Sequence, residues 1–257
     1  MLIVRNTEEI EILRENNLLV SKTLGEISQM IQPGVTTLEL DKRAEEFIRD
    51  HGAEPGFLGY GGFPNTLCTS VNDAVVHGIP SDYQLKEGDI VSIDCGTKKD
   101  GYYGDSAYTF KVGEVSEELE NLLKATKESL YKGIEKAIAG NRVGDISFAV
   151  QFHAENHGYS VVREMVGHGL GANMHESPEI PNYGKRGKGP KRKEGMVICI
   201  EPIINKGNRS IKQDRDGWTI RTLDGKYSAH YELALAIRNG EPDILSTFDY
   251  IVEYQKI

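Results

Sequence analysis

Apolar side chains at helical spacing dominate the start of the chain. Over residues 7–31 they recur every three or four positions, and Asn17 is the only polar member of the stripe. This spacing predicts a helix over 7–31 with Thr7 as its N-cap. A capping box then opens a second predicted helix over 37–51. Both helices are expected to pack on a sheet of the same chain, with a coiled-coil partner as the alternative for the first.

Short β-branched segments predict strands in the rest of the first half. They cover residues 67–71, 75–77, 89–93 and 104–110. Asp100-Gly101 is a type I′ hairpin signal, so the last two strands should be antiparallel neighbours. Asp94 is expected to end the strand that precedes it. Residues 53–65 are rich in glycine, proline and aromatic side chains, which predicts a loop that can bring rings close to a ligand.

The second half repeats this mixture of helices and strands. Amphipathic patterns predict helices over 116–139 and 145–157, and apolar runs predict strands over 161–162 and 196–200. Residues 167–190 contain many glycines and prolines and are expected to form an ordered, functional loop. Asp224-Gly225 predicts a last hairpin between residues 218–223 and 226–237, and a short hydrophobic segment follows over 248–254. No linker is apparent, so we expect one domain over residues 1–257.

An internal repeat relates the two halves. The sequence KEGDIVSID (86–94) aligns without gaps with KEGMVICIE (193–201), 107 residues later. Residues 34–52 match residues 140–158 at a displacement of 106. This repeat indicates halves of about 1–112 and 113–257 related by a pseudo-twofold axis. Each half would then supply one carboxylate, Asp94 or Glu201, from the same strand end.

Composition narrows the class of protein. With 39% hydrophobic and 27% charged residues, the chain is typical of soluble globular proteins. The net charge of −9 argues against DNA or RNA binding by the whole surface. Cys68, Cys95 and Cys199 show no CxxC spacing and are expected to be reduced core thiols. No apolar run reaches membrane-spanning length and no signal peptide is apparent, so a cytoplasmic protein is expected, with no membrane contact and a monomer as the default.

Acidic residues in apolar strands form a candidate metal centre. Asp94 and Asp105 lie on the predicted hairpin, where like charges are unfavourable unless a proton or cation lies between them. An acidic pair on a hairpin is usually a solvated turn. Here His168, Glu201 and Glu232 add three ligands in glycine-rich or apolar surroundings. Four carboxylates and one imidazole nearly balance two divalent cations, which can share a bridging hydroxide and activate it as a nucleophile.

Five sequence motifs, spread over nearly the whole chain, match those of a single protein family. They are VVHGIP (75–80), DCGTKKDGYYGDSAYTF (94–110), GHGLGANMHESPEIPNYG (167–184), MVICIEP (196–202) and TLDGKYSAHYELALAI (222–237). The chain resembles the type I methionine aminopeptidases of the creatinase-like "pita-bread" metallopeptidases. The resemblance implies an α+β pita-bread fold with pseudo-twofold symmetry, an antiparallel sheet and helices on its outer face. It implies a metallo-aminopeptidase that removes the initiator methionine of nascent polypeptides when the second residue is small.

The resemblance also implies roles for individual residues. Two divalent ions (Co, Mn, Fe, Zn or Ni) would be held by Asp94, Asp105, His168, Glu201 and Glu232. His77 would bind near the substrate's amine and scissile amide, His175 would stabilise the tetrahedral intermediate, and Glu201 would also carry a proton. The methionine pocket would be formed by Tyr60, Phe63, Cys68 and Trp218, together with His77 and His175. A monovalent cation (Na or K) would lie near Asn72, Ala74 and Ser228.

Some details of the sequence leave alternatives open. Phe57 and Met174 stand where some relatives have Cys and Phe, which affects the shape of the pocket. Residues 185–193 (KRGKGPKRK) carry six basic side chains, either as a solvated loop or as a contact with ribosomal RNA. Two other functions use the same fold: a proline-specific peptidase, which normally has an added N-terminal domain, and a non-enzymatic binding module, which lacks several ligands.

Overall fold

The computed structural model describes residues 2–252. Its helices are α1 (Thr7–Ser28), α2 (Thr37–Asp50), α3 (Glu117–Ile134) and α4 (Val143–Asn156), with a single 3-10 turn at Tyr60–Gly62. The strands of the first half are β1 (Glu54–Pro55), β2 (Leu67–Val71), β3 (Ala74–Val76), β4 (Ile90–Lys99) and β5 (Tyr102–Lys111). Those of the second half are β6 (Ser160–Val161), β7 (Val166–Gly169), β8 (Glu176–Pro181), β9 (Val197–Ile200), β10 (Ile203–Asn205), β11 (Ile211–Gln213), β12 (Ile220–Thr222), β13 (Ser228–His230), β14 (Leu233–Ala236) and β15 (Asp243–Ile244).

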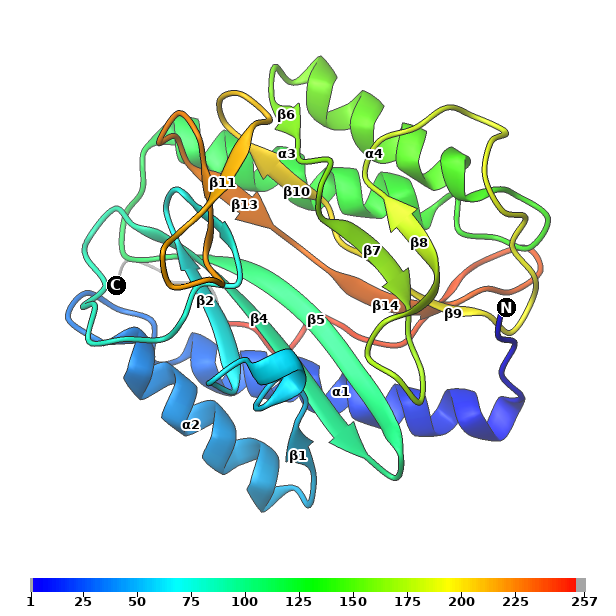
Figure 1. The fold of residues 1–257 in the computed structure, drawn as a ribbon, viewed down its shortest axis with the longest axis horizontal. Helices are drawn as coiled ribbons and strands as arrows, with labels where there is room; N and C mark the ends of the chain where they lie inside the picture. Colours follow the sequence, from blue (N-terminus) through cyan, green and yellow to red (C-terminus); the bar gives the residue numbers. More distant parts are fainter. Residues whose placement is uncertain (1, 253–257) are drawn as a thin grey trace.

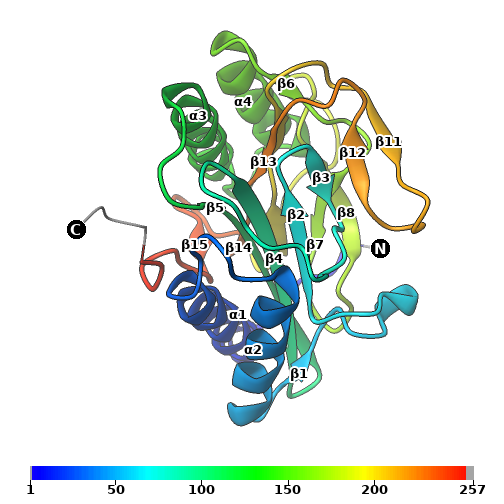
Figure 2. The same ribbon diagram turned by 90° about the vertical axis from the view of Figure 1, so that its left-hand side faces the viewer.

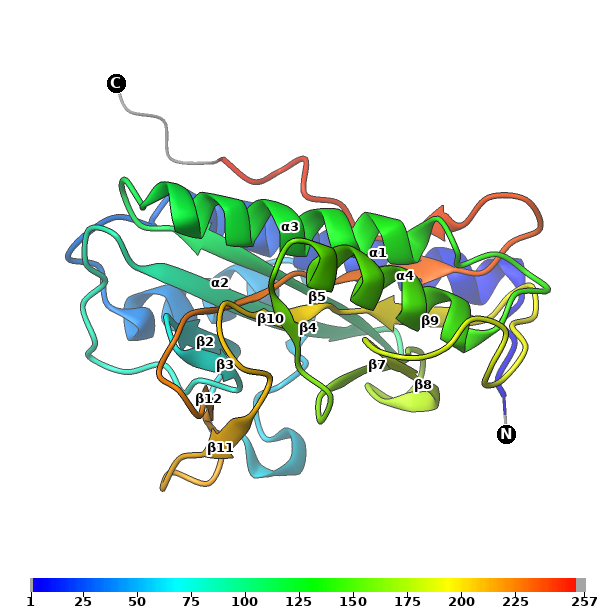
Figure 3. The same ribbon diagram turned by 90° about the horizontal axis from the view of Figure 1, so that it is seen from above.

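Helices and strands form separate layers, which confirms the predicted α+β class. The pairings between the strands named above are all antiparallel. Figure 1 shows α1 and α2 beside the first half of the strands and α3 and α4 beside the second half. Seen from the side and from above, α1, α3 and α4 lie on one side of the long strands, whereas β3, β11 and β12 lie on the other (Figures 2 and 3). The open side therefore carries the shorter strands and the loops between them.

The N-terminal helix begins at Thr7, the first residue of the predicted range, but its N-cap lies one residue earlier than predicted. Asn6, not Thr7, is the N-cap: its side chain accepts the N–H of Glu9, and the Glu9 carboxylate accepts the N–H of Asn6. An amide oxygen at this position satisfies one of the helix's free N–H groups. The helix ends at Ser28 rather than Ile31, although Ile31 still packs in the core. The capping box predicted for α2 is present at Thr36.

The β4–β5 hairpin is longer than predicted and sets the offset of its two acids. Asp100 (φ 52°) and Gly101 (φ 80°) form the type I′ turn. The strand does not end at Asp94 but continues to Lys99. Asp94 pairs with Ala107, and Asp105 pairs with Gly96. The two carboxylates are therefore diagonal neighbours on one face, not directly opposite residues, because residues two apart on a strand share a face.

The internal repeat appears as equivalent elements. The bounds of α4 are those of α2 shifted by 106 residues (143 − 37 and 156 − 50), and β9 begins 107 residues after β4 (197 − 90). Gly52 (φ 70°) follows α2 and Gly158 (φ 82°) follows α4, each one residue past the C-cap histidine. Only glycine takes such left-handed backbone without cost, so both helices end in the same way.

Several predictions for the second half were wrong in detail. Helix α3 ends at Ile134, not at 139, and α4 starts at Val143. The expected loop over 167–190 contains β8 and most of β7, which pair with each other. The expected hairpin around Asp224-Gly225 does not form a ladder: β12 pairs with β11 and β3, whereas β13 pairs with β10. The strands on either side of this turn pair with strands distant in sequence, and not with each other as the local turn signal suggested.

The buried apolar residues of the described chain form a main cluster that contains Cys95, a second cluster that contains Cys68 and Cys199, and a small third one. Cys68, Cys95 and Cys199 are buried and free, as predicted. In the tail, Phe248 and Ile251 pack on the core, while residues 253–254 of the predicted hydrophobic segment lie outside the described residues. Within residues 2–252, no helix has the length and apolarity needed to cross a bilayer.

Candidate metal centre

All five predicted metal ligands line one cavity of about 310 Å³. Asp94 comes from β4, Asp105 from β5 and His168 from β7, whereas Glu201 directly follows β9 and Glu232 lies between β13 and β14. The backbone N–H of Glu232 donates to the carbonyl of Ala107 on β5 at 2.9 Å, so this residue joins the two halves. The cavity is thus built where the strands of both halves meet.

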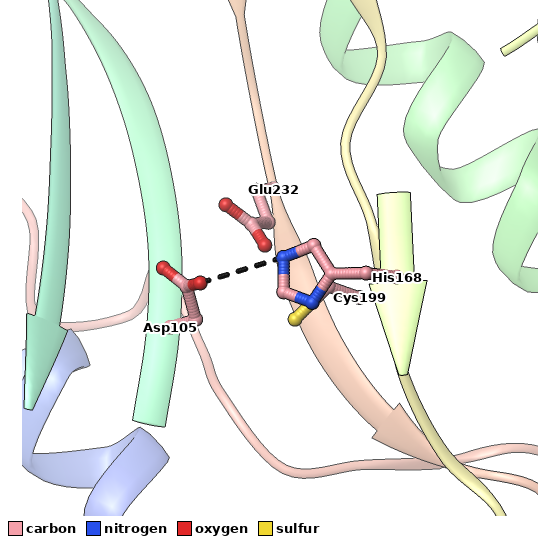
Figure 4. A group of neighbouring side chains, drawn as sticks. All are labelled: Asp105, His168, Cys199 and Glu232. Carbon is pink, nitrogen blue, oxygen red and sulfur yellow. Dashed lines mark ion pairs between the residues drawn. The ribbon is translucent and has the colours of Figure 1, made fainter. Parts of the chain in front are cut away.

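The ligand atoms converge closely. The Nε2 atom of His168 lies 3.6 Å from Oδ2 of Asp105 and 3.7 Å from Oε1 of Glu201. Figure 4 shows Asp105, His168 and Glu232 directed toward a common point, with Cys199 behind them. One potential ligand atom from each of these four residues lies within 4.8 Å of the others.

Burial makes four ionised carboxylates unfavourable without a cation. Desolvation raises the pKa of Asp94 to about 7. It also raises the pKa values of Asp105, Glu201 and Glu232 well above their usual range, and each neighbouring acid raises them further. Divalent ions held by these carboxylates would reverse this situation, because their positive charge would stabilise the ionised form.

Several carboxylate oxygens are free to bind a cation. Among the described residues, Oδ1 of Asp94, Oδ1 of Asp105 and Oε1 of Glu232 are buried and have no hydrogen-bond partner. Unpaired buried acceptors are costly, so their convergence requires a physical explanation. Oxygen ligands with a single imidazole suit divalent ions of hard to borderline character, and the residues therefore fit a metal.

The imidazole of His168 is neutral and presents a ring nitrogen to the cavity. Its Nδ1 is 3.0 Å from the carbonyl oxygen of Gly169, so Nδ1–H donates there and Nε2 keeps its lone pair toward the cavity. Burial, together with the nearby His175, lowers the pKa of His168 to about 4, which keeps the ring neutral. A neutral imidazole is the form that binds metal ions.

Cys199 belongs to the same cluster, although the sequence indicated only a core thiol. Its pKa is raised, first by burial and then by Glu232 and Asp105, so the sulfur remains protonated. The thiol hydrogen-bonds to the Glu232 carboxyl. We interpret Cys199 as a group that orients Glu232 rather than as a thiolate ligand.

The two further histidines predicted from motifs line the same cavity. His77 has φ 57°, an uncommon backbone conformation for a residue with a side chain. The Nδ1 atom of His175 is 2.9 Å from the hydroxyl of Tyr60, and its ring centroid is 4.4 Å from that of His168. Burial lowers the pKa values of both His77 and His175, so both rings are neutral at pH 7.

An apolar pocket opens beside the acids. The predicted pocket residues Tyr60, Phe63, Cys68 and Trp218 all line the cavity, together with Phe57. The Phe63 and Trp218 rings meet edge to face with centroids 5.2 Å apart. Met174 does not line the cavity: it is fully buried, and its methyl group lies against Gly96 and Gly56. Its effect on pocket shape is therefore indirect.

Two other predicted features lie outside the cavity: the monovalent-cation site near Asn72 and the basic segment 185–193. The backbone oxygen of Asn72 accepts the N–H of Ser228 at 2.9 Å, and β3, which begins at Ala74, contacts β13. In the basic segment 185–193, Arg192 is 1% exposed, so this side chain does not contribute to a charged surface. The Arg186 guanidinium lies 4.4 Å from the centre of the Phe148 ring.

Sequence reasoning missed His230, which also lines the cavity. Its Nε2 is buried, has no hydrogen-bond partner among the described residues and lies 3.8 Å from Oε2 of Glu201. The backbone is held by Thr109, whose hydroxyl accepts the N–H of His230 and donates to its carbonyl. His230 stands two residues before Glu232, and this spacing was a signal that both face the same side.

Known proteins resemble this chain over nearly its whole length. Residues 11–239 match the family described as metallopeptidase family M24. A methionine aminopeptidase of Clostridium acetobutylicum is 51% identical over 247 residues, which cover 96% of this chain and 99% of that protein. Methionine aminopeptidase 1 of Bacillus subtilis is 49% identical over 246 residues, with 96% and 99% covered.

Solved structures share the fold. The structure of a methionine aminopeptidase from Rickettsia prowazekii superposes with a TM-score of 0.95 at 40% identity, covering 96% of this chain and 100% of that one. An Xaa-Pro dipeptidase from Bacillus anthracis superposes with a TM-score of 0.78 at 22% identity. This chain covers only 62% of that dipeptidase, so the likeness concerns the fold of a shared part.

Proposed function

Because the chain belongs to metallopeptidase family M24, we propose that it is an aminopeptidase that uses divalent metal to release the initiator methionine of nascent polypeptides. One observation carries this proposal: a buried cluster of four acids and one imidazole lies directly beside an apolar, aromatic pocket. Relatives about half identical over nearly the full chain are methionine aminopeptidases. A non-enzymatic module would not require so costly a cluster, and the proline-specific relatives are more distant.

We assign the binding of two divalent ions to Asp94, Asp105, His168, Glu201 and Glu232. When bound, such ions lower the pKa of water to supply a nucleophile and polarise the scissile carbonyl. Two observations support this assignment: three carboxylate oxygens are unpaired, and Nε2 of the buried His168 keeps a lone pair directed into the cavity. The donor set is compatible with Co, Mn, Fe, Zn or Ni.

The chain's own groups would hold the substrate. The methionine side chain would enter the pocket of Phe57, Phe63, Cys68 and Trp218, where the apolar lining and soft sulfur contacts favour a thioether. This side chain and the acid cluster share one cavity of about 310 Å³, so the scissile bond of a bound chain would lie close to the proposed metal ligands.

Histidine chemistry would assist the reaction. Nδ1 of His175 lies 2.9 Å from the Tyr60 hydroxyl, which we assign as the donor, so that the neutral ring would carry its proton on Nε2. That N–H would donate to the carbonyl oxygen as negative charge develops, an interaction worth about 3–4 kcal/mol in related oxyanion holes. His77 would bind near the substrate's amine and amide. Glu201, which lines the same cavity, would accept the proton of the nucleophile and pass it to the leaving amine.

Two further assignments, a monovalent cation site and a contact with ribosomal RNA, accompany the main one. A monovalent cation would bind backbone oxygens near Asn72, Ala74 and Ser228, where two strand ends meet. Basic side chains of residues 185–193 would contact ribosomal RNA while the enzyme acts on nascent chains. Neutralising Lys185, Arg186 and Lys188 should then weaken salt-sensitive co-sedimentation with ribosomes. The same number of changes on the helices, at Lys22, Lys42 and Lys132, serves as the control, and unchanged binding of the first variant would refute the contact.

A peptide assay tests the main proposal. Metal-stripped protein is given Mn²⁺ or Co²⁺ and then Met-Ala-Ser or Pro-Ala-Ser. We expect metal-dependent release of methionine and none of proline. Release of proline would assign the chain to the proline-specific branch, and no release from folded protein with any of the metals would favour a binding module.

A further inference from the structure

A second group of metal-binding side chains lies on the helical face, outside the cavity described above. Glu128 on α3 and His153 on α4, with His157 at the C-cap of α4, each place a potential ligand atom within 4.8 Å of the others. Nε2 of His153 is already 3.1 Å from Oε2 of Glu128. None of the three residues lines the catalytic cavity. Figure 1 shows α3 and α4 side by side at the edge of the fold.

The hydrogen bonds leave a free nitrogen on His157. Its Nδ1 lies 2.8 Å from the backbone oxygen of His153, four residues earlier. Because a carbonyl only accepts, Nδ1 must carry the proton, and Nε2 keeps its lone pair. Metal-binding histidines characteristically donate their other ring N–H to a carbonyl or carboxylate in this way.

The first half of the chain provides an internal comparison for a purely structural role. At the end of α2, Nδ1 of His51 lies 2.8 Å from the backbone oxygen of Phe47, and the two rings are tilted by 36° with centroids 4.2 Å apart. The His153–His157 rings are tilted by the same 36° at 4.4 Å. The cap histidine is therefore structural in both halves. What differs is the partner ring, phenylalanine in one half and histidine in the other, and this difference supplies a ligand.

The spacing of the three groups matches a tetrahedral site. Bonds of about 2.0–2.1 Å to zinc place two ligands roughly 3.3 Å apart. The Glu128–His153 pair at 3.1 Å already has this separation, and His157 keeps a potential ligand atom within 4.8 Å of both. We propose that Glu128, His153 and His157 form a second metal site that takes Zn²⁺ and links α3 to α4.

The ligand types favour zinc over the hard cations. Two imidazoles and one carboxylate suit Zn²⁺, Ni²⁺ or Cu²⁺, whereas Mg²⁺ and Ca²⁺ prefer oxygen ligands alone. Three protein ligands leave a fourth position for water in a tetrahedral site. Because the site bridges two helices that pack on each other, bound metal should stabilise the folded state.

Zinc stoichiometry tests the proposal. Full-length protein is stripped with EDTA, and Zn²⁺ is titrated in competition with a chromogenic chelator. His153→Phe reproduces the Phe–His pair of α2, and His157→Ala removes the cap nitrogen. His51→Ala is the matched control, because it removes the equivalent cap contact from α2 without touching the proposed site.

We expect wild type and His51→Ala to bind one more equivalent of Zn²⁺ than His153→Phe or His157→Ala. Glu128→Gln should weaken that equivalent by at least about tenfold. Zinc held by the catalytic cavity is common to all variants and cancels in the comparison. Release of methionine with Mn²⁺ should stay at the wild-type rate in His153→Phe, which shows that the variant is folded. Equal zinc binding by wild type, His153→Phe and His157→Ala would overturn the site.

Discussion

Glu232→Gln should have opposite effects on the metal-free and the metal-loaded protein. The side chain is 2% exposed, and its Oε1 has no hydrogen-bond partner within the described part of the chain. Its backbone is held independently: the N–H donates to Ala107, and the Ser106 hydroxyl donates to its carbonyl at 2.6 Å. The variant should therefore fold, and only the chemistry of the side chain changes.

The expected magnitudes follow from these contacts. An unsatisfied buried acceptor such as Oε1 costs about 1–3 kcal/mol, and an amide NH₂ at its position would donate to neighbouring carboxyl oxygens, so the metal-free variant should be more stable by up to roughly that amount. Metal at 100 times its dissociation constant stabilises the wild type by about 2.7 kcal/mol. If the variant binds about 100-fold more weakly, the same metal concentration stabilises it by only about 0.4 kcal/mol.

Urea denaturation with EDTA and with Mn²⁺ measures both effects, and release of methionine from Met-Ala-Ser measures activity. Glu15→Gln, which removes one negative charge from an exposed position of α1, is the control and should behave like the wild type. We expect Glu232→Gln to lose most activity. Full activity, or an undiminished stabilisation by Mn²⁺, would refute the assignment of this residue as a ligand.

Three further changes test the surroundings of the site. His230→Leu should lower kcat about tenfold with little change in KM. His230→Gln keeps a polar group near the position of Nε2 and should restore kcat. Equal kcat values in the two variants would exclude a positioning role. Gly78→Ala places a Cβ 2.2 Å from the carbonyl oxygen of Thr69 and should cost about 1–3 kcal/mol in urea denaturation, a loss whose absence would show that the β2–β3 region can relax. Tyr60→Phe removes the hydroxyl that fixes the His175 tautomer, and a fall in kcat of up to about tenfold is expected at unchanged stability, whereas an unchanged kcat would count against the hydrogen bond.

Local signals in the sequence predicted much of the fold. The capping box at Thr36 and the Asp100-Gly101 turn are complete within four residues, so nothing distant competes with them. The gathering of these acids was also predictable, because carboxylates such as Asp94 and Glu201 interrupt apolar strands in a way that is costly without a counter-ion. The repeat then indicated that these two acids meet, and both line one cavity.

Features decided by distant contacts could not be predicted in the same way. The turn at Asp224-Gly225 suggested a hairpin, but Ile220 pairs with Val76 and Ser228 with Asn205. The sequence around the turn contains no signal that identifies Val76 and Asn205 as the pairing partners. The basic segment shows the same limit, because its pattern gave no sign that Arg192 is buried while its neighbours remain at the surface.

The internal repeat is consistent with the place of the cavity, and the differences between the two repeats determine which ligands each half supplies. Asp94 and Glu201 are equivalent, yet β4 continues past Asp94, whereas Pro202 follows Glu201 and lacks the N–H needed to extend β9. The first half adds a second acid, Asp105, through its long hairpin, and the second half adds an imidazole and Glu232. Neither half contains a complete ligand set, and the backbone contact between Glu232 and Ala107 joins them at the cavity itself. Metal binding therefore depends on the correct packing of one half against the other, and a bound ion stabilises that packing in return.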